Sequence, residues 1–264
     1  ADVLLVCRLP GTYPVLRAIG LAQRFGLQVY YDIDDLIFDA EHFPPPLSSY
    51  GGTISADLHT GLGLDAPLFE AAMRQADAVI VSVNYRHAPE HRFPAAADDG
   101  YAAICWLADH AAELGAYAGH IAVAGWSAGA NVAAVAAQTA RDHGAPLVCG
   151  QLLLTPVTDC ETTGSYRENG EGYLLTAALM EWFWNHYCDP ADRTNPKASP
   201  LRGNLAGLPR TMVVTCEFDP LRDEGNAYAA ALAAAGVEVQ HVQARGHIHT
   251  SLTMVDVILS GASY

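Results

Sequence analysis

IAVAGWSAG, residues 121–129, is the strongest indication of the fold, because a short apolar run leads directly into a serine flanked by small residues. Residues 128–142, which follow, are rich in alanine and predict a helix. A Gly-x-Ser-x-Gly motif between a strand and a helix is typical of a nucleophile elbow, a sharp turn that exposes the serine hydroxyl. We therefore predict that Ser127 is a nucleophile. The N–H of Ala128, at the start of the helix, is a predicted oxyanion donor.

Apolar runs alternate with helix-like segments along the whole chain, which predicts a mostly parallel sheet flanked by helices. The predicted strands are residues 3–7, 28–33, 78–84, 121–124, 151–155, 211–216 and 238–243. The predicted helices are residues 14–25, 66–75, 95–114, 128–142, 176–187, 223–235 and 251–260. Residues 43–63 hold three consecutive prolines and paired glycines, and they predict a long loop.

A serine hydroxyl is a weak nucleophile by itself and needs a base that is oriented by an acid. In proteins with this elbow, the acid follows the serine in the chain and the histidine follows the acid. Asp219 comes after the predicted strand 211–216, and His249 comes after the predicted strand 238–243. Both residues fall at the C-terminal ends of strands, where open parallel sheets build their sites.

Two choices stay open when only these residues are considered. Glu217 and Asp223 compete with Asp219 for the role of the acid, although Asp223 fits better in the first turn of the next helix, where the helix dipole favours a negative charge. His247 competes with His249 for the role of the base, and their spacing does not separate them.

Composition limits the classes of partner. The chain has 264 residues, enough for one large α/β domain, and its net charge of −15 includes a single lysine, Lys197. This charge disfavours nucleic acids and anionic membranes, because both require a basic surface. No run is long enough for a membrane span, and the first residues lack the pattern of a signal peptide. The six cysteines lack metal-binding spacing, so we expect buried thiols in a reducing, cytoplasmic compartment.

Two other patterns suggest metal ions, but each has a simpler interpretation. Asp32, Asp34 and Asp35 could hold a divalent cation, yet acidic residues at a strand end are more often part of a turn. His87 and His91 have the spacing of zinc ligands on a helix, but Pro89 between them interrupts a helix. We therefore expect no metal site.

Residues 83–264 resemble the bacterial hormone-sensitive-lipase-like esterases. The similar stretches are residues 83–95, 125–131, 192–201 and 219–225, followed by Ile248-His249. The resemblance implies an α/β-hydrolase fold with Ser127 as nucleophile, Asp219 as orienting acid and His249 as base, since the family's histidine directly follows the position of Ile248. It also implies short- to medium-chain acyl esters as substrates and no cofactor.

The sequence departs from this family at three places. Trp126 stands where the family usually has aspartate, and Thr250-Ser251 stand where Gly-Phe usually follow the histidine. The family's His-Gly-Gly-Gly motif, which supplies oxyanion donors, is absent, and the nearest candidates are Gly51 and Gly52 in the predicted loop. A weak or inactive ligand-binding protein is therefore the alternative function. Trp126, Trp182 and Phe183 are the predicted substrate-binding side chains.

Residues 1–82 resemble a piece of a glycosyltransferase, notably in residues 29–39 and 50–52. The two resemblances together suggest a chimera joined near residues 79–83, in which the N-terminal segment supplies the early strands. We expect a single α/β-hydrolase domain over residues 1–264 with a reduced or atypical cap. A glycosyltransferase activity would rest on the N-terminal third alone, and whether the chain forms a homodimer is open.

Overall fold

The computed structural model describes residues 3–7, 23–24, 28–33, 78–249 and 251. The chain divides into two compact units. The first comprises Ala1–Asn84 with Asp109–Ala118, and the second comprises Tyr85–Ala108 with Gly119–Tyr264. The predicted loop 43–63, the helix 66–75 and nearly all of the helices 14–25 and 251–260 lie outside the described residues.

The first unit contains a parallel three-stranded sheet in the order β1-β2-β3. These strands are β1 (Val3–Cys7), β2 (Gln28–Ile33) and β3 (Ala78–Val81). The predicted bounds of the first two strands are confirmed. The third strand is shorter than the predicted strand 78–84, and it ends before the polar pair Ser82 and Asn84.

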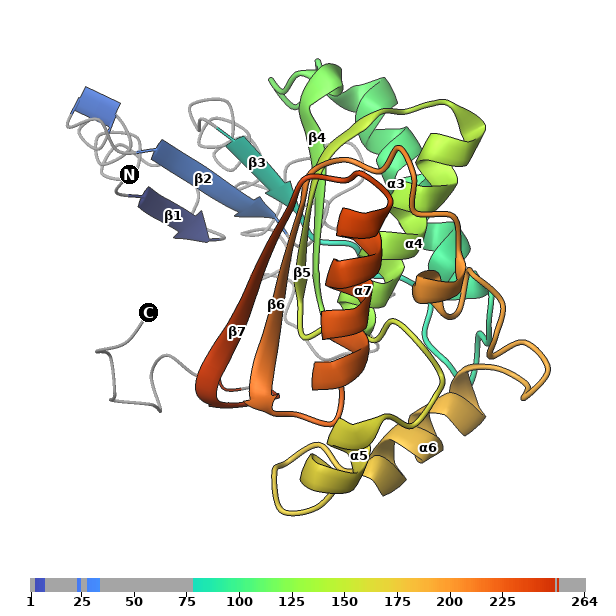
Figure 1. The fold of residues 1–264 in the computed structure, drawn as a ribbon. Coiled ribbons are helices and arrows are strands. Elements are labelled where there is room, and N and C mark those ends of the chain that lie inside the picture. Colours follow the sequence, from blue (N-terminus) through green and yellow to red (C-terminus); the bar gives the residue numbers. More distant parts are fainter. Residues whose placement is uncertain (1–2, 8–22, 25–27, 34–77, 250, 252–264) are drawn as a thin grey trace, which may run out of the picture. The chain divides into compact units, whose positions relative to one another are not determined.

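The second unit contains a parallel four-stranded sheet in the order β4-β5-β6-β7 (Figure 1). Its strands are β4 (Ile121–Trp126), β5 (Val148–Leu154), β6 (Thr211–Phe218) and β7 (Val239–Ile248). All four strands were predicted, and β4, β6 and β7 run further toward their C-terminal ends than expected. Hydrophobic periodicity does not predict these C-terminal residues, because they lie at the candidate site rather than in the core.

The helices of the second unit begin and end at recognisable residues. They are α3 (Ala95–His110, whose end belongs to the first unit), α4 (Ala128–His143), α5 (Gly164–Asn169), α6 (Ala177–Tyr187) and α7 (Arg222–Ala234). The side chain of Thr176 caps α6 by accepting the N–H of Leu179 at 3.1 Å. Gly144, with φ 74°, ends α4 in the left-handed conformation. The prediction missed α5, and it extended α3 to residue 114 although the helix ends at His110.

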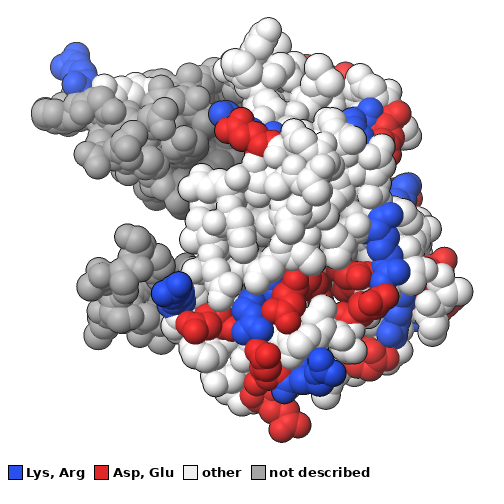
Figure 2. Space-filling model, in the orientation of Figure 1, with Lys and Arg blue, Asp and Glu red and all other residues white. Residues whose placement is uncertain are grey.

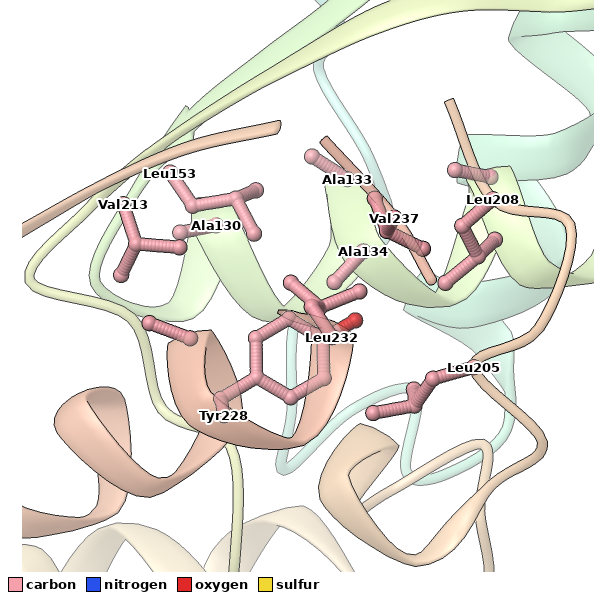
Figure 3. Close-up of a cluster of buried hydrophobic side chains, with 12 residues drawn as sticks. Ala130, Ala133, Ala134, Leu153, Leu205, Leu208, Val213, Tyr228, Leu232 and Val237 are labelled. Atoms are coloured by element: carbon pink, nitrogen blue, oxygen red, sulfur yellow. The ribbon is translucent and has the colours of Figure 1, made fainter. Parts of the chain in front are cut away.

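The main core lies between this sheet and the helices α4 and α7, which cover the same face (Figure 1). Small residues on α4 allow the helix to approach the strands closely, and Tyr228 and Leu232 on α7 fill the remaining space (Figure 3). The buried cluster consists of Ala130, Ala133, Ala134, Ala137, Leu153, Leu205, Leu208, Val213, Tyr228, Ala229, Leu232 and Val237. This packing fixes α4, and therefore its first turn beside Ser127.

A second apolar cluster lies under α6. It joins Met180 and Trp184 of α6 to Tyr166 of α5 and to Leu221, which is only 1% exposed. Because Leu221 follows closely after Asp219 in the chain, this cluster anchors the turn that carries the candidate acid. None of the helices in the described part of the chain is long and apolar enough to cross a membrane.

Candidate active site

Ser127 lies on a strained turn between β4 and α4. Its φ of 55° and ψ of −117° are unusual for a residue with a side chain, and such strain is typical of functional sites. The turn is held because the N–H of Ser127 donates to the carbonyl of Leu154 at 2.9 Å. A Cβ atom at Gly125 would overlap the backbone of Gly129 and Ala130, so the turn closes only with glycine there. The local structure is that of a nucleophile elbow.

The side chains of Ser127, His249 and Asp219 form a continuous hydrogen-bonded chain. His249 Nε2 lies 2.9 Å from Ser127 Oγ, and His249 Nδ1 lies 2.7 Å from Asp219 Oδ2. His249 is 4% exposed and Asp219 is 1% exposed. With its ring proton on Nδ1, His249 donates to Asp219 and accepts from the serine hydroxyl, which is the arrangement that a general base requires.

The competing acids and the competing histidine have other partners. The carboxylate of Asp223 accepts the N–H of Ser165 at 2.8 Å, and the carboxylate of Glu217 accepts the N–H of Gly246 at 2.7 Å. His247 Nδ1 lies 2.8 Å from the hydroxyl of Ser251. The geometry therefore favours Asp219 and His249 as the partners of Ser127.

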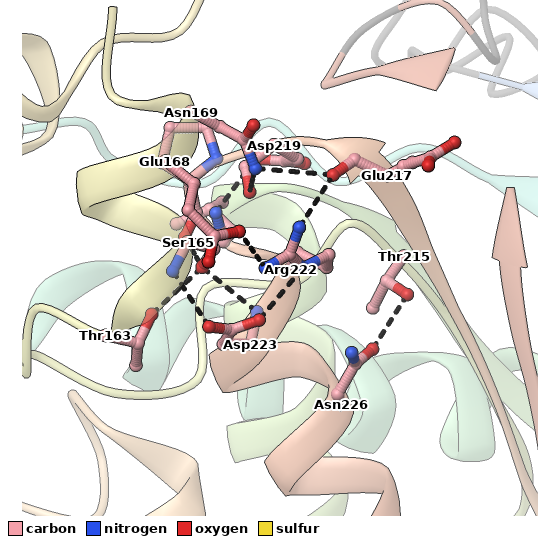
Figure 4. A network of polar contacts seen from close by, with 12 residues as sticks. Thr163, Ser165, Glu168, Asn169, Thr215, Glu217, Asp219, Arg222, Asp223 and Asn226 are labelled. Atoms are coloured by element: carbon pink, nitrogen blue, oxygen red, sulfur yellow. Dashed lines mark hydrogen bonds and ion pairs between the residues drawn. The ribbon is translucent and has the colours of Figure 1, made fainter. Parts of the chain in front are cut away.

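A polar network holds the turn around Asp219, and much of it comes from α5 (Figure 4). The side-chain amide of Asn169 donates to the carbonyls of Glu217 at 3.3 Å and Asp219 at 3.5 Å. The hydroxyl of Ser165 donates to the carbonyl of Pro220 at 2.6 Å. Sequence reasoning missed this support, although Thr163 and Gly170 on either side of α5 are residues that commonly flank a short helix.

Charged side chains gather around this network on the surface. Figure 2 shows acidic and basic residues in a band over α5, α6 and the start of α7, whereas the face above this band is mostly uncharged. Several of these residues form ion pairs: Arg222 with Glu168 and Asp223, Arg202 with Asp159 and Glu161, and Arg193 with Glu181. Glu168, Glu161 and Glu181 are well exposed, so the pairs that they form contribute little to stability by themselves.

One predicted oxyanion donor can be placed. Ala128 is the first residue of α4, and the first hydrogen bonds of this helix are donated by Ala130 and Asn131 to the carbonyl of Ser127. The N–H of Ala128 precedes them and has no acceptor within the part of the chain that the structure describes. Gly51 and Gly52, the other predicted donors, lie outside the described residues.

The predicted substrate-binding aromatics lie in two places. The ring of Trp126 is 5.9 Å from the ring of His249 between centroids, so it lies next to the imidazole of the candidate base. Trp182 and Phe183 lie on α6, where both are about half exposed. Their ring centroids lie 5.4 Å apart, and the ring of Trp182 also packs against that of His186 at 4.0 Å in a tilted arrangement.

Neither of the metal patterns is assembled in the described residues. Asp32 belongs to β2, whereas Asp34 and Asp35 lie outside the described part of the chain. Within residues 78–249 and the other described segments, no group of three or more histidine, cysteine or acidic side chains could hold a metal ion.

Glu224 is a buried acid next to the candidate site. Its carboxylate accepts the N–H groups of Thr158 at 2.7 Å and Asp159 at 3.3 Å and the hydroxyl of Tyr166 at 3.2 Å. Complete burial nevertheless raises the pKa of Glu224 from 4.5 to about 8, because desolvation outweighs these hydrogen bonds. Burial beside this acid also raises the pKa of Tyr166. Glu224 is therefore expected to be largely protonated in the folded protein at neutral pH.

This raised pKa predicts a pH-dependent stability. Between pH 4.5 and about 8 the folded state binds a proton at Glu224 that the unfolded chain has released, so the free energy of unfolding falls as the pH rises through this range. Glu224→Gln keeps the shape of the side chain but cannot bind or release this proton. Its free energy of unfolding should therefore not show this decrease with rising pH. Urea unfolding of both proteins at several pH values would measure it, with the exposed Glu171→Gln as control. If the free energy of unfolding changes with pH equally in wild type and Glu224→Gln, the prediction is wrong.

Comparisons with known proteins identify the family of the chain. A family model of the alpha/beta hydrolase fold matches residues 51–253, so the chain belongs to the hormone-sensitive-lipase-like α/β hydrolases. The prediction of a parallel sheet flanked by helices is confirmed. The carboxylic ester hydrolase LipN of Mycobacterium tuberculosis is 41% identical over 242 residues, which cover 81% of this chain and 62% of LipN. The esterase LipI of the same organism is 42% identical, covering 75% of this chain and 62% of LipI.

Solved structures of esterases are also similar. The hyperthermophilic esterase of the archaeon Pyrobaculum calidifontis has a TM-score of 0.66 and 43% identity, covering 72% of this chain and 63% of that esterase. The thermostable carboxylesterase EstE1 from a metagenomic library has a TM-score of 0.67 and 40% identity, covering 75% of this chain and 68% of EstE1. The match with LipN and LipI spans 62% of the length of each of these curated relatives.

Proposed function

We propose that the protein is a serine carboxylesterase that hydrolyses short- to medium-chain acyl esters. The observation that carries this proposal is the hydrogen-bonded chain from Ser127 through His249 to the buried Asp219, which starts on a strained elbow. The esterase names of relatives that are about 40% identical support the same reaction.

In the proposed mechanism, Ser127 Oγ attacks the ester carbonyl while His249 Nε2 takes the hydroxyl proton. The carboxylate of Asp219 accepts from His249 Nδ1 and stabilises the imidazolium that forms. The negative charge on the carbonyl oxygen is stabilised by the N–H of Ala128, and we assign the remaining donors to Gly51 and Gly52. The match of the family model begins at residue 51, which supports this assignment.

The rest of the cycle uses the same residues. His249 gives its proton to the leaving alcohol, and an acyl-enzyme remains on Ser127. His249 then activates a water molecule that releases the acid. No step in this scheme requires a metal ion or an organic cofactor.

We assign the substrate pocket to Trp126, Trp182 and Phe183. The position of Trp126 beside the imidazole of His249, which lies 2.9 Å from Ser127 Oγ, supports its contact with the substrate. The exposed rings of Trp182 and Phe183 on α6 offer apolar surface for an acyl chain or an alcohol.

We further propose that the N-terminal segment has a different, glycosyltransferase-like origin and contributes strands to a bacterial, cytoplasmic hydrolase with a reduced cap. The family match begins at residue 51, so we place the junction before this residue rather than near residues 79–83. The boundary between the two compact units at Asn84 and Tyr85 therefore does not mark it. Whether the protein acts as a homodimer would be decided by its mass in solution.

The function can be tested by measuring hydrolysis of p-nitrophenyl acetate and p-nitrophenyl butyrate by the purified chain. A fluorophosphonate probe, followed by peptide mapping, would identify the activated serine. We expect turnover of both esters and labelling of Ser127. A protein that neither turns over the esters nor reacts with the probe would be a ligand-binding member of the fold, and labelling of a different serine would refute the assignment of Ser127.

A further inference from the structure

β7 changes its register directly before His249. Cys216 of β6 pairs with Ala244 of β7, but the next pair is Phe218 with Ile248. Between these pairs β6 advances from 216 to 218 while β7 advances from 244 to 248, so β7 contains two additional residues. Such bulges often lie next to active sites, where they redirect a side chain.

The bulge determines which histidine reaches the acid. With regular pairing, Phe218 would lie opposite Gly246, and His247 would follow at the level of Asp219. The two additional residues instead place Ile248 opposite Phe218, so His249 follows at that level. This register accounts for the hydrogen bond between His249 and Asp219, and it resolves the choice between His247 and His249 that the spacing in the sequence leaves open.

Glu217 stabilises the centre of the bulge. A bulge leaves a backbone N–H without a partner in the ladder. Within this bulge the N–H of Gly246, which has φ 76°, donates to Glu217 Oε2 at 2.7 Å. A hydrogen bond from an N–H to a carboxylate is stronger than one to a neutral acceptor.

The backbone of Glu217 is held from the opposite side. Its carbonyl accepts hydrogen bonds from the guanidinium of Arg222 at 3.2 Å and from Asn169 at 3.3 Å. In Figure 4 the carboxylate of Glu217 points away from these two residues. Glu217 therefore connects the turn that carries Asp219 to the strand that carries His249.

We propose that Glu217 is a positioning residue, whose carboxylate fixes the β7 bulge so that His249 stays within hydrogen-bond distance of both Asp219 and Ser127. This inference rests on the proposed esterase function, in which Glu217 does not touch the substrate. Loss of its bond should displace His249 without removing any member of the triad. A displacement of about 1 Å can lower the rate by about 100-fold.

The test compares Glu217→Ala with Glu217→Gln. The amide oxygen of glutamine can accept the N–H of Gly246, whereas alanine cannot. For Glu217→Ala we expect kcat on p-nitrophenyl butyrate to fall about 10- to 100-fold with KM nearly unchanged, and the fluorophosphonate labelling rate to fall by a similar factor. Glu217→Gln should keep most of the activity. Glu171→Ala, an exposed glutamate outside the network, should behave as wild type and serves as control.

A spectroscopic measurement separates this proposal from the proposed function. The proton shared by His249 Nδ1 and Asp219 gives a low-field proton NMR signal whether or not the protein hydrolyses esters. The signal should weaken in Glu217→Ala and persist in Glu217→Gln, while thermal unfolding shows that both variants remain folded. An unchanged signal with unchanged kcat in Glu217→Ala would overturn the proposal, and so would equal losses in both variants. Inactivity of the wild type would refute only the esterase function.

If Glu217→Ala does not fold, substitutions of Gly246 provide the same test. A Cβ atom at Gly246 meets no described atom within 4 Å, so only its positive φ restricts the side chain. Gly246→Asn can adopt this conformation and should keep the NMR signal, because asparagine tolerates positive φ. Gly246→Val cannot, and it should weaken the signal and lower kcat. Equal behaviour of the two Gly246 variants would contradict a role for the bulge.

Discussion

Ser127→Ala is expected to lower kcat for p-nitrophenyl esters by about 10⁴- to 10⁶-fold. The variant removes the hydroxyl that lies 2.9 Å from His249 Nε2, so no acyl-enzyme can form at this position. The fold should be retained, because the elbow is held by the backbone of Ser127 and by Gly125 rather than by the hydroxyl. The measurement is steady-state hydrolysis, with circular dichroism to verify that the variant is folded.

A double variant gives this prediction its control. Triad residues act as a unit, so Ser127→Ala with His249→Ala should be hardly slower than either single variant. Additive losses would show that the two residues act in separate steps. A loss of less than about tenfold in Ser127→Ala would contradict the proposed nucleophile.

Asp219→Asn is expected to lower kcat by about 10⁴-fold at neutral pH. Asp219 Oδ1 accepts the N–H of Leu221 at 2.9 Å, so asparagine would keep its oxygen at that position. Its NH₂ group would then face His249 Nδ1 and could only donate to it. The ring proton would move to Nε2, where His249 can no longer accept the proton of Ser127.

Asp223→Asn is the matched control for the assignment of the acid. Its carboxylate bonds to Ser165 and Arg222 and lies in the first turn of α7, so its loss should cost about 1 kcal/mol of stability and change kcat little. Both variants can be compared by kcat and by urea unfolding. A larger loss of kcat in Asp223→Asn than in Asp219→Asn would reverse the assignment.

The sequence was most informative where local rules determine the structure. The apolar run before Gly125 and the alanines after Ser127 predict a strand, a turn and a helix, and these elements are present as β4 and α4. The placement of the acid and the histidine near Ser127 could also be predicted, because the C-terminal ends of parallel strands lie at the same edge of a sheet.

The features that could not be predicted from sequence patterns depend on contacts between distant segments of the chain. The spacing did not separate His249 from His247, and only the family resemblance favoured His249. The physical reason is the register of β7 against β6, which sequence patterns do not reveal because a bulge has no hydrophobic periodicity of its own. Likewise, α5 is too short to show a helical pattern, although Asn169 and Ser165 support the acid turn. Trp182 and Phe183 could be placed on a helix, but their partial exposure on α6 depends on packing that the sequence does not show.

The position of Leu221 in the cluster under α6 has a consequence for heat inactivation. The cluster under α6 is separate from the core between the sheet, α4 and α7, so we expect it to loosen at a lower temperature than the larger core. We therefore expect activity to be lost before the protein unfolds as a whole. Engineering for heat resistance should then begin at α6 and its contacts with Leu221 rather than in the larger core.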